Sequence, residues 1–111
     1  MMEISTKELG KATLVQVSGE VDMSNSPKVR ETLMGLTKRK VPAILVDLGG
    51  VSYMDSSGIA TLVEGLQEAM GYGGKFRLAA LTPKVRQVFE LARLTDVFEI
   101  FADLAGAQEG L

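Results

Sequence analysis

The sequence of 111 residues contains no cysteine and no histidine. Without cysteine, the chain has no disulfide, no thiolate nucleophile and no cysteine-ligated metal site, which fits a reducing compartment. Without histidine, neither a Ser-His-Asp triad nor a common zinc site can form, because carboxylates alone would have to supply the metal ligands. The missing residue types therefore exclude histidine-dependent nucleophilic enzymes and the common zinc enzymes.

The sequence also lacks an excess of one charge and any long apolar run. The 12 basic residues are balanced by 14 acidic ones and mixed among them, so no basic face is available for the phosphate contacts of nucleic acids. No apolar run approaches the ~20 residues needed to cross a bilayer, and residues 1–7 lack the basic and apolar regions of a leader. We therefore expect a cytoplasmic protein that binds no nucleic acid and does not insert into a membrane.

Hydrophobic periodicity predicts a single α/β domain over residues 1–111, in which 46% of the residues are apolar. The predicted order is β-β-α-β-α-β-α-β with a C-terminal helical tail, so the chain starts with a β-hairpin and continues in alternating βα units. Right-handed crossovers then give a mostly parallel sheet. The predicted strands are Glu3–Glu8, Thr13–Gly19, Ala43–Leu48, Phe76–Leu81 and Val97–Phe101.

Local signals predict where the helices begin and end. Ser26 is suited to cap the first helix, and Pro27 to occupy its first position. The second helix follows the serine pair at residues 56 and 57, and the glycine-rich stretch 71–74 ends it. Thr82 and Pro83 open the third helix. Each helix is thus predicted between two strands, as βα units require.

Functional sites in such a sheet lie where the strands end and the helices begin, because free N–H groups and the helix dipole favour anions there. Two loops qualify, Gly19–Ser26 and Val51–Gly58. If the strands before them are neighbours, Asp22 and the paired serines lie side by side.

Enzymatic readings of these loops find little support. The window around Ser56 lacks the first glycine of a nucleophile elbow, and no histidine can act as base. The glycine-rich stretch 71–75 follows a helix and has neither P-loop nor dinucleotide-binding spacing. Carboxylates are present, but the sequence does not show that they meet around a pocket. We expect a protein that is not an enzyme and needs no cofactor or metal. The candidate carboxylates for acid/base catalysis are Glu20, Asp22, Asp47 and Asp55.

The run Asp55-Ser56-Ser57 has more capping groups than one helix needs. A helix cap explains one or two of these residues and contributes ~1 kcal/mol. A spare hydroxyl at a helix N-terminus is a suitable phosphoacceptor, since the dipole tolerates the dianion that forms. From the residues alone, capping and phosphorylation both remain open, and either serine could serve in either role.

The motifs taken together resemble one family, the bacterial anti-sigma factor antagonists of the STAS domain family. The resemblance runs over essentially the whole chain and is most specific in the Asp-Ser-Ser-Gly block. Its motifs are Gly19–Asp22, Val46–Leu48, Val51–Gly58 and Leu81–Arg86. Residues 59–65 are less similar than the block, which leaves the identity of the partner open.

The resemblance implies a fold with its helices largely on one side of the sheet, and a partner-switching function. In this family the unphosphorylated antagonist binds an anti-sigma factor and so releases the sigma factor. That anti-sigma factor is a serine kinase with a histidine-kinase-like ATPase fold. It phosphorylates the second serine of the motif, here Ser57, and a metal-dependent serine phosphatase resets the switch. The partner-binding residues so implied are Asp22, Ser24, Asn25, Met54, Asp55, Ser56 and Gly58.

The same domain type also implies an alternative function. STAS domains serve as interaction subunits of lipid-transport or other membrane-associated complexes, and there the serine can serve packing alone.

Overall fold

The computed structural model describes all residues, 1–111, and has the predicted order of elements. The strands are β1 (Met2–Leu9), β2 (Ala12–Val21), β3 (Ala43–Met54), β4 (Lys75–Ala79) and β5 (Glu99–Phe101). The helices are α1 (Ser26–Lys38), α2 (Ser56–Gly71), α3 (Pro83–Leu91) and α4 (Leu104–Gln108). The predicted α/β class is confirmed.

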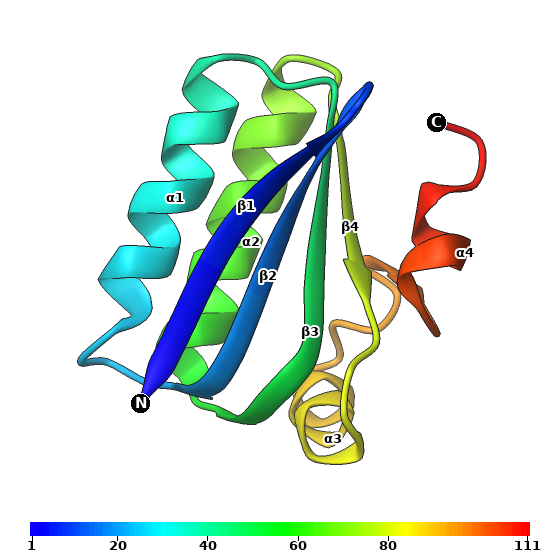
Figure 1. Ribbon diagram of the computed structural model, residues 1–111. Helices are drawn as coiled ribbons and strands as arrows, with labels where there is room; N and C mark the ends of the chain where they lie inside the picture. Colours follow the sequence, from blue (N-terminus) through cyan, green and yellow to red (C-terminus); the bar gives the residue numbers. More distant parts are fainter.

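The five strands form one mixed sheet in the order β1-β2-β3-β4-β5 (Figure 1). β1 runs antiparallel to β2 through a tight turn in which Gly10 takes a positive φ of 73°, a conformation that glycine adopts without strain. The other neighbouring pairs are all parallel. The predicted hairpin start and the mostly parallel sheet are therefore confirmed.

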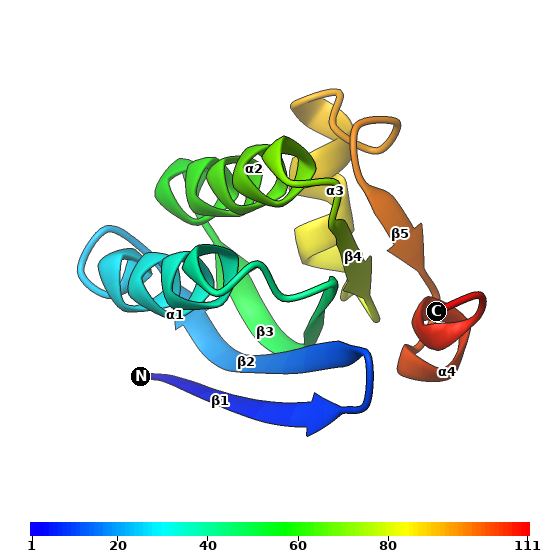
Figure 2. The ribbon, with the colours of Figure 1, turned by 90° about the horizontal axis from the view of Figure 1, so that it is seen from above.

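Helices α1 and α2 cover one face of the sheet, and the main core lies between these two layers (Figures 1 and 2). Fully buried leucine, isoleucine and valine side chains from both layers fill this core, which is the main source of stability. They include Val15, Leu33, Ile44, Leu62 and Leu78. The short helix α4 packs on the opposite face over a smaller cluster of mostly alanines and leucines. The helices thus lie largely on one side, with α4 as the exception.

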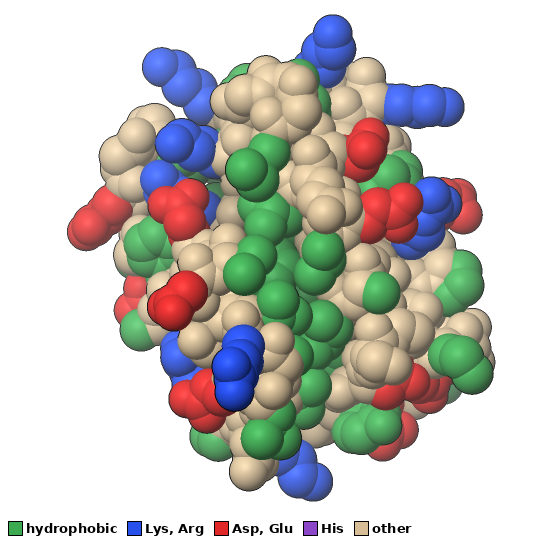
Figure 3. Space-filling view, turned by 180° about the vertical axis from the view of Figure 1, so that it is seen from behind, with side chains coloured by type: hydrophobic (Ala, Val, Ile, Leu, Met, Phe, Trp, Pro, Cys, Tyr) green, Lys and Arg blue, Asp and Glu red, His purple; other side chains and the backbone are tan.

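The outer surface of the helical layer is mixed in character. Seen from behind, it carries a band of apolar side chains along its middle, with charged side chains mainly toward its margins (Figure 3). None of the helices combines the length and the apolar character that crossing a membrane requires.

Strand β3 is longer than predicted and ends at Met54 instead of Leu48. The sequence did not predict the second half of this strand, because Gly49 and Gly50 interrupt the apolar pattern that indicates a strand. The pairing of β2 with β3 also shifts register twice in this region. A Cβ on Gly50 would lie 2.8 Å from the Cβ of Ser18, so the glycine permits the close approach of the two strands. The longer strand carries the chain directly to Asp55.

Other boundaries differ from the predictions by a few residues, and β2 continues past Gly19 to Val21, into the predicted loop. The N-cap of α1 is Asn25, and Ser26 is the buried first residue of the helix rather than its cap. β4 ends at Ala79, because Ala80 has a positive φ of 61°. β5 begins only at Glu99.

Candidate functional site

The two loops singled out in the sequence meet at one end of the sheet. β2 and β3 are parallel neighbours, and their last paired residues are Val21 and Met54. The backbone N–H of Asp55 donates to the carbonyl oxygen of Val21 over 3.1 Å. Asp22 and Asp55 therefore leave adjacent strands at the same edge, where α2 begins (Figure 1). The predicted juxtaposition of Asp22 with the serine pair holds.

Asp55 is the N-cap of α2 and organises the loop around one carboxylate oxygen. Its Oδ1 accepts hydrogen bonds from the backbone N–H of Ser57 at 2.9 Å and of Gly58 at 3.3 Å. The same oxygen accepts the hydroxyl of Ser57, with Oγ at 2.5 Å. The hydrogen bond from the Ser57 hydroxyl, helped by the backbone N–H groups of Gly58 and Ser57, lowers the pKa of Asp55. Asp55 is thus ionised at neutral pH.

The two serines differ in their surroundings. Ser57 is half-buried, and both its N–H and its hydroxyl are held by Asp55. Its carbonyl oxygen accepts the hydroxyl of Thr61 at 3.0 Å. Ser56 is exposed, and its hydroxyl makes no hydrogen bond within the protein. The structure thus fixes the position of one hydroxyl and leaves the other free.

A similar arrangement holds the loop after β2. Asp22 Oδ1 accepts the backbone N–H of Ser24 at 2.9 Å and its hydroxyl at 2.5 Å. Asn25 Oδ1 accepts the N–H of Asp22 at 3.0 Å, and its side-chain nitrogen donates to the carbonyl of Glu20 at 2.8 Å. These bonds make the loop a closed, well-determined turn. The hydrogen bonds from Ser24 lower the pKa of Asp22, although the negative charge of Asp55 opposes this.

The site therefore combines two ionised carboxylates with one oriented hydroxyl at a helix N-terminus. No group of three acidic side chains comes close enough to hold a metal ion. The arrangement can present a serine hydroxyl to an incoming phosphoryl group, and it can offer negative charge to a basic partner surface.

Two of the predicted partner-binding residues are covered in the structure. The side chain of Met54 is only 3% exposed and belongs to the main core. Gly58 is also buried, and a Cβ there would lie 2.7 Å from Met54 Cγ and 2.9 Å from Val21 Cγ1. Met54 points inward because it pairs with Val21 at the buried end of β3. Met54 and Gly58 can therefore shape the contact loop from within the core, without lying on its outer surface.

The structure adds two exposed apolar residues that the sequence reasoning missed. Met23 is 77% exposed between Asp22 and Ser24, and Tyr53 is 47% exposed just before Met54. The sequence carried a weak signal for Met23 alone, as an isolated apolar residue within a polar loop.

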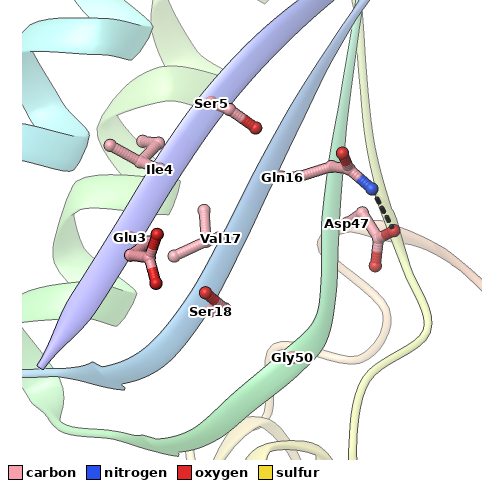
Figure 4. A pocket seen from close by; sticks show the side chains of 8 residues that line it. All are labelled: Glu3, Ile4, Ser5, Gln16, Val17, Ser18, Asp47 and Gly50. Carbon is pink, nitrogen blue, oxygen red and sulfur yellow. Dashed lines mark hydrogen bonds between the residues drawn. The ribbon is translucent and has the colours of Figure 1, made fainter.

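A separate polar hollow lies on the sheet face that α1 and α2 leave open (Figure 4). Its volume is about 340 Å³, and strands β1, β2 and β3 line it. Asp47 lies here, bound by Gln16 at 3.5 Å and by the N–H of Gly49 at 2.8 Å. Asp47 therefore does not join Asp22 and Asp55, and the hollow is distinct from the serine site.

The sequence model of the STAS domain family matches residues 3–107, which is nearly the whole chain. The chain belongs to the STAS domain family. The resemblance noted in the sequence is thereby confirmed.

This STAS domain is similar in sequence to anti-sigma-B factor antagonists. It is 28% identical to that of Bacillus subtilis (strain 168) over 105 residues, which cover 95% of both chains. It is 32% identical to that of Listeria monocytogenes serovar 1/2a over 84 residues, covering 76% of this chain and 74% of the relative.

Solved structures share the fold of this STAS domain. An anti-sigma factor antagonist from Mycobacterium paratuberculosis superposes with a TM-score of 0.89 at 24% identity, covering 96% of this chain and 91% of the other. The antagonist SpoIIAA in its unphosphorylated form gives a TM-score of 0.83 at 21% identity, covering 95% of this chain and 92% of the other. Bacillus SpoIIAA in the phosphorylated form gives a TM-score of 0.76 at 20% identity, covering 95% of this chain and 96% of the other.

Proposed function

We propose that this STAS domain is an anti-sigma factor antagonist switched by phosphorylation of Ser57. In its unphosphorylated form it binds an anti-sigma factor serine kinase through the surface around Asp22 and Asp55, and so frees the sigma factor. The kinase transfers a phosphoryl group to Ser57, which ends the complex, and a metal-dependent serine phosphatase restores the binding form. The domain is a binding protein in this cycle and catalyses no step itself.

The observation that carries the proposal is the fixed hydroxyl of Ser57 at the N-terminus of α2. Asp55 holds this hydroxyl by the 2.5 Å hydrogen bond, so the acceptor oxygen has one defined position on the surface. The relatives named anti-sigma-B factor antagonists support the role, and SpoIIAA, a structural neighbour, is described in phosphorylated and unphosphorylated forms.

The chemistry of the step explains why phosphorylation acts as a switch. Ser57 Oγ forms a bond to the γ-phosphorus of ATP, ADP leaves, and the hydroxyl proton passes to a base. The hydrogen bond to Asp55 is lost with that proton, and a group carrying about −1.5 to −2 charge now faces Asp55 and Asp22. Like-charge repulsion and desolvation in the interface then oppose binding. A loss of ~1.4 to 3 kcal/mol already weakens the complex about ten- to a hundredfold or more.

The first experiment locates the phosphate. The protein is incubated with its anti-sigma factor kinase and ATP, and the product is mapped by mass spectrometry. We expect one phosphate, on Ser57, with none in Ser57→Ala and the phosphate still on Ser57 in Ser56→Ala. Phosphate on Ser56 instead, or on neither serine, would contradict the assignment.

The second experiment measures the switch itself. In calorimetric titrations with the kinase, Ser57→Ala should bind as tightly as the unphosphorylated protein, whereas Ser57→Asp should bind at least tenfold more weakly because it adds charge. Equal affinities would count against the charge mechanism. Stable copurification with membrane-complex subunits, without any phosphoserine, would favour the alternative role as an interaction subunit.

A further inference from the structure

Met23 is the most exposed apolar side chain of the serine site, yet it lies on a tightly hydrogen-bonded turn. We propose that Met23 is a specificity-determining anchor that inserts into an apolar recess of the kinase, with basic groups of the kinase around that recess. This inference rests on the proposed function, since it concerns the partner of the same surface. It adds a residue outside the predicted partner-binding set.

The turn holds the backbone of Met23 in one position before any partner arrives. Asp22 and Ser24 on either side are joined by two hydrogen bonds to Asp22 Oδ1. The carbonyl oxygen of Asp22 accepts the N–H groups of Asn25 at 3.1 Å and Ser26 at 2.8 Å, which ties the turn to the start of α1. Because the backbone is already ordered, binding costs little further loop entropy, and this favours an anchor residue.

The charges around Met23 define the chemistry of the complementary surface. Met23 directly follows Asp22, and the N–H of Asp55 donates to the carbonyl oxygen of Val21, two residues before Met23, so both carboxylates belong to the same end of the sheet as Met23. Tyr53 adds a second exposed apolar group at the same edge, because its strand partner is Glu20, two residues before Asp22. The same end of the sheet therefore carries two exposed apolar side chains and two negative charges. The fitting surface has an apolar recess bordered by lysine or arginine.

Met23 also has the properties of a residue that selects partners. An unbranched, flexible side chain adapts to the shape of a recess, and methionine is enriched at protein interfaces. Full burial of this side chain, compared with alanine, corresponds to about a ten- to hundredfold change in Kd. Since Met23 makes no contribution to the core, this free energy is available for binding.

The test compares two exposed methionines of the same chain. Met70 is 66% exposed in the last turn of α2, at the opposite end of that helix from Ser57, and serves as the matched control. The Kd of Met23→Ala, Met23→Leu and Met70→Ala is measured by calorimetry against the kinase that phosphorylates the wild-type protein on Ser57. Thermal unfolding of each variant checks that the fold is retained.

We expect Met23→Ala to weaken binding at least tenfold, Met23→Leu to stay within about threefold of the wild type, and Met70→Ala within about twofold. If Met23→Ala binds within twofold of the wild type while Ser57→Asp still weakens binding, the anchor is overturned and the phosphorylation switch stands. Equal losses in Met23→Ala and Met70→Ala would also overturn the anchor. If no serine kinase binds or phosphorylates the wild-type protein, the anchor and the proposed function both fail.

Discussion

At the scale of single residues, Asp55 performs two tasks with one oxygen. It caps α2 through the N–H groups of Ser57 and Gly58, and it positions the hydroxyl of Ser57. We expect Asp55→Ala to destabilise the protein by about 0.5 to 2 kcal/mol, the usual contribution of an N-cap. Ser56→Ala is the control, since this exposed hydroxyl has no partner in the protein, and it should change stability by less than about 0.5 kcal/mol. Urea unfolding of both variants measures the difference, and equal stabilities would contradict the capping role.

The same carboxylate makes stability depend on acid pH. Hydrogen bonding lowers the pKa of Asp55 in the folded protein, so the unfolded chain binds its proton at a higher pH. The contribution is present at neutral pH, begins to fall below about pH 4, where the unfolded carboxyl titrates, and is lost as pH drops through the lower folded pKa. We expect the Tm of Asp55→Asn to fall less between pH 6 and pH 3 than that of the wild type. If the Tm of both proteins falls equally between pH 6 and pH 3, the pKa of Asp55 does not contribute to the pH dependence of stability.

At the scale of elements, the contact of α2 with its neighbours depends on a glycine. A Cβ on Gly65 would lie 2.9 Å from Phe76 Cε2 and 3.2 Å from Leu33 Cδ1, so both neighbours must move. We expect Gly65→Ala to destabilise the protein by about 1 to 3 kcal/mol through overpacking. Gly35 in α1 has nothing within 4 Å of its Cβ position, and Gly35→Ala should stabilise by about 0.5 to 1 kcal/mol. Urea unfolding of the pair tests the prediction, and destabilisation by both variants would refute it.

Elements with a regular apolar period were predictable, and those without one were not. The spacing of Ile59, Leu62 and Leu66 identifies α2, and its glycine-rich end at residues 71–74 follows the expected helix stop. Met70 was assigned to the same apolar face but is 66% exposed. The second half of β3 was missed, because Gly49 and Gly50 remove the signal and only pairing with β2 makes it a strand. In the site, the sequence placed Asp22 beside the serine pair, and only the family resemblance singled out Ser57, whose role stays a prediction. Met54 was expected to shape the contact loop, and its burial shows that it does so from within the core, which only the strand register decides.

At the scale of the whole molecule, Arg77 fastens the C-terminal segment to the sheet. Its Nη1 donates to the carbonyl oxygens of Ala107 at 3.0 Å and Glu109 at 2.8 Å, and its guanidinium lies 5.3 Å from the ring centre of Phe101. We expect Arg77→Ala to increase hydrogen exchange in residues 104–109, because α4 loses its main polar attachment. Phosphorylation of Ser57 should be unchanged, since α4 packs on the other face of the sheet.

The matched control for this attachment is Arg86→Ala. Arg86 is exposed on α3, and its side chain makes no hydrogen bond or ion pair. Hydrogen exchange measured by mass spectrometry should therefore show no change in residues 104–109 for this variant. Unaltered exchange in Arg77→Ala would show that packing alone holds α4.

The sequence by itself determined the α/β class, the order of the elements and the two loops that form the site, because these depend on local period and on the residues at helix ends. It also excluded histidine and cysteine chemistry by composition. Only the tertiary structure decided which serine is held and which is free, that Met54 is buried, and that Met23 is exposed beside two carboxylates. The hold on Ser57 is a local contact within the cap formed by Asp55. The burial of Met54 and the meeting of the two loops depend on the register of β2 against β3, which brings residues more than thirty positions apart into contact. Local sequence patterns carry no information on that pairing, since it is set by the packing of the whole sheet.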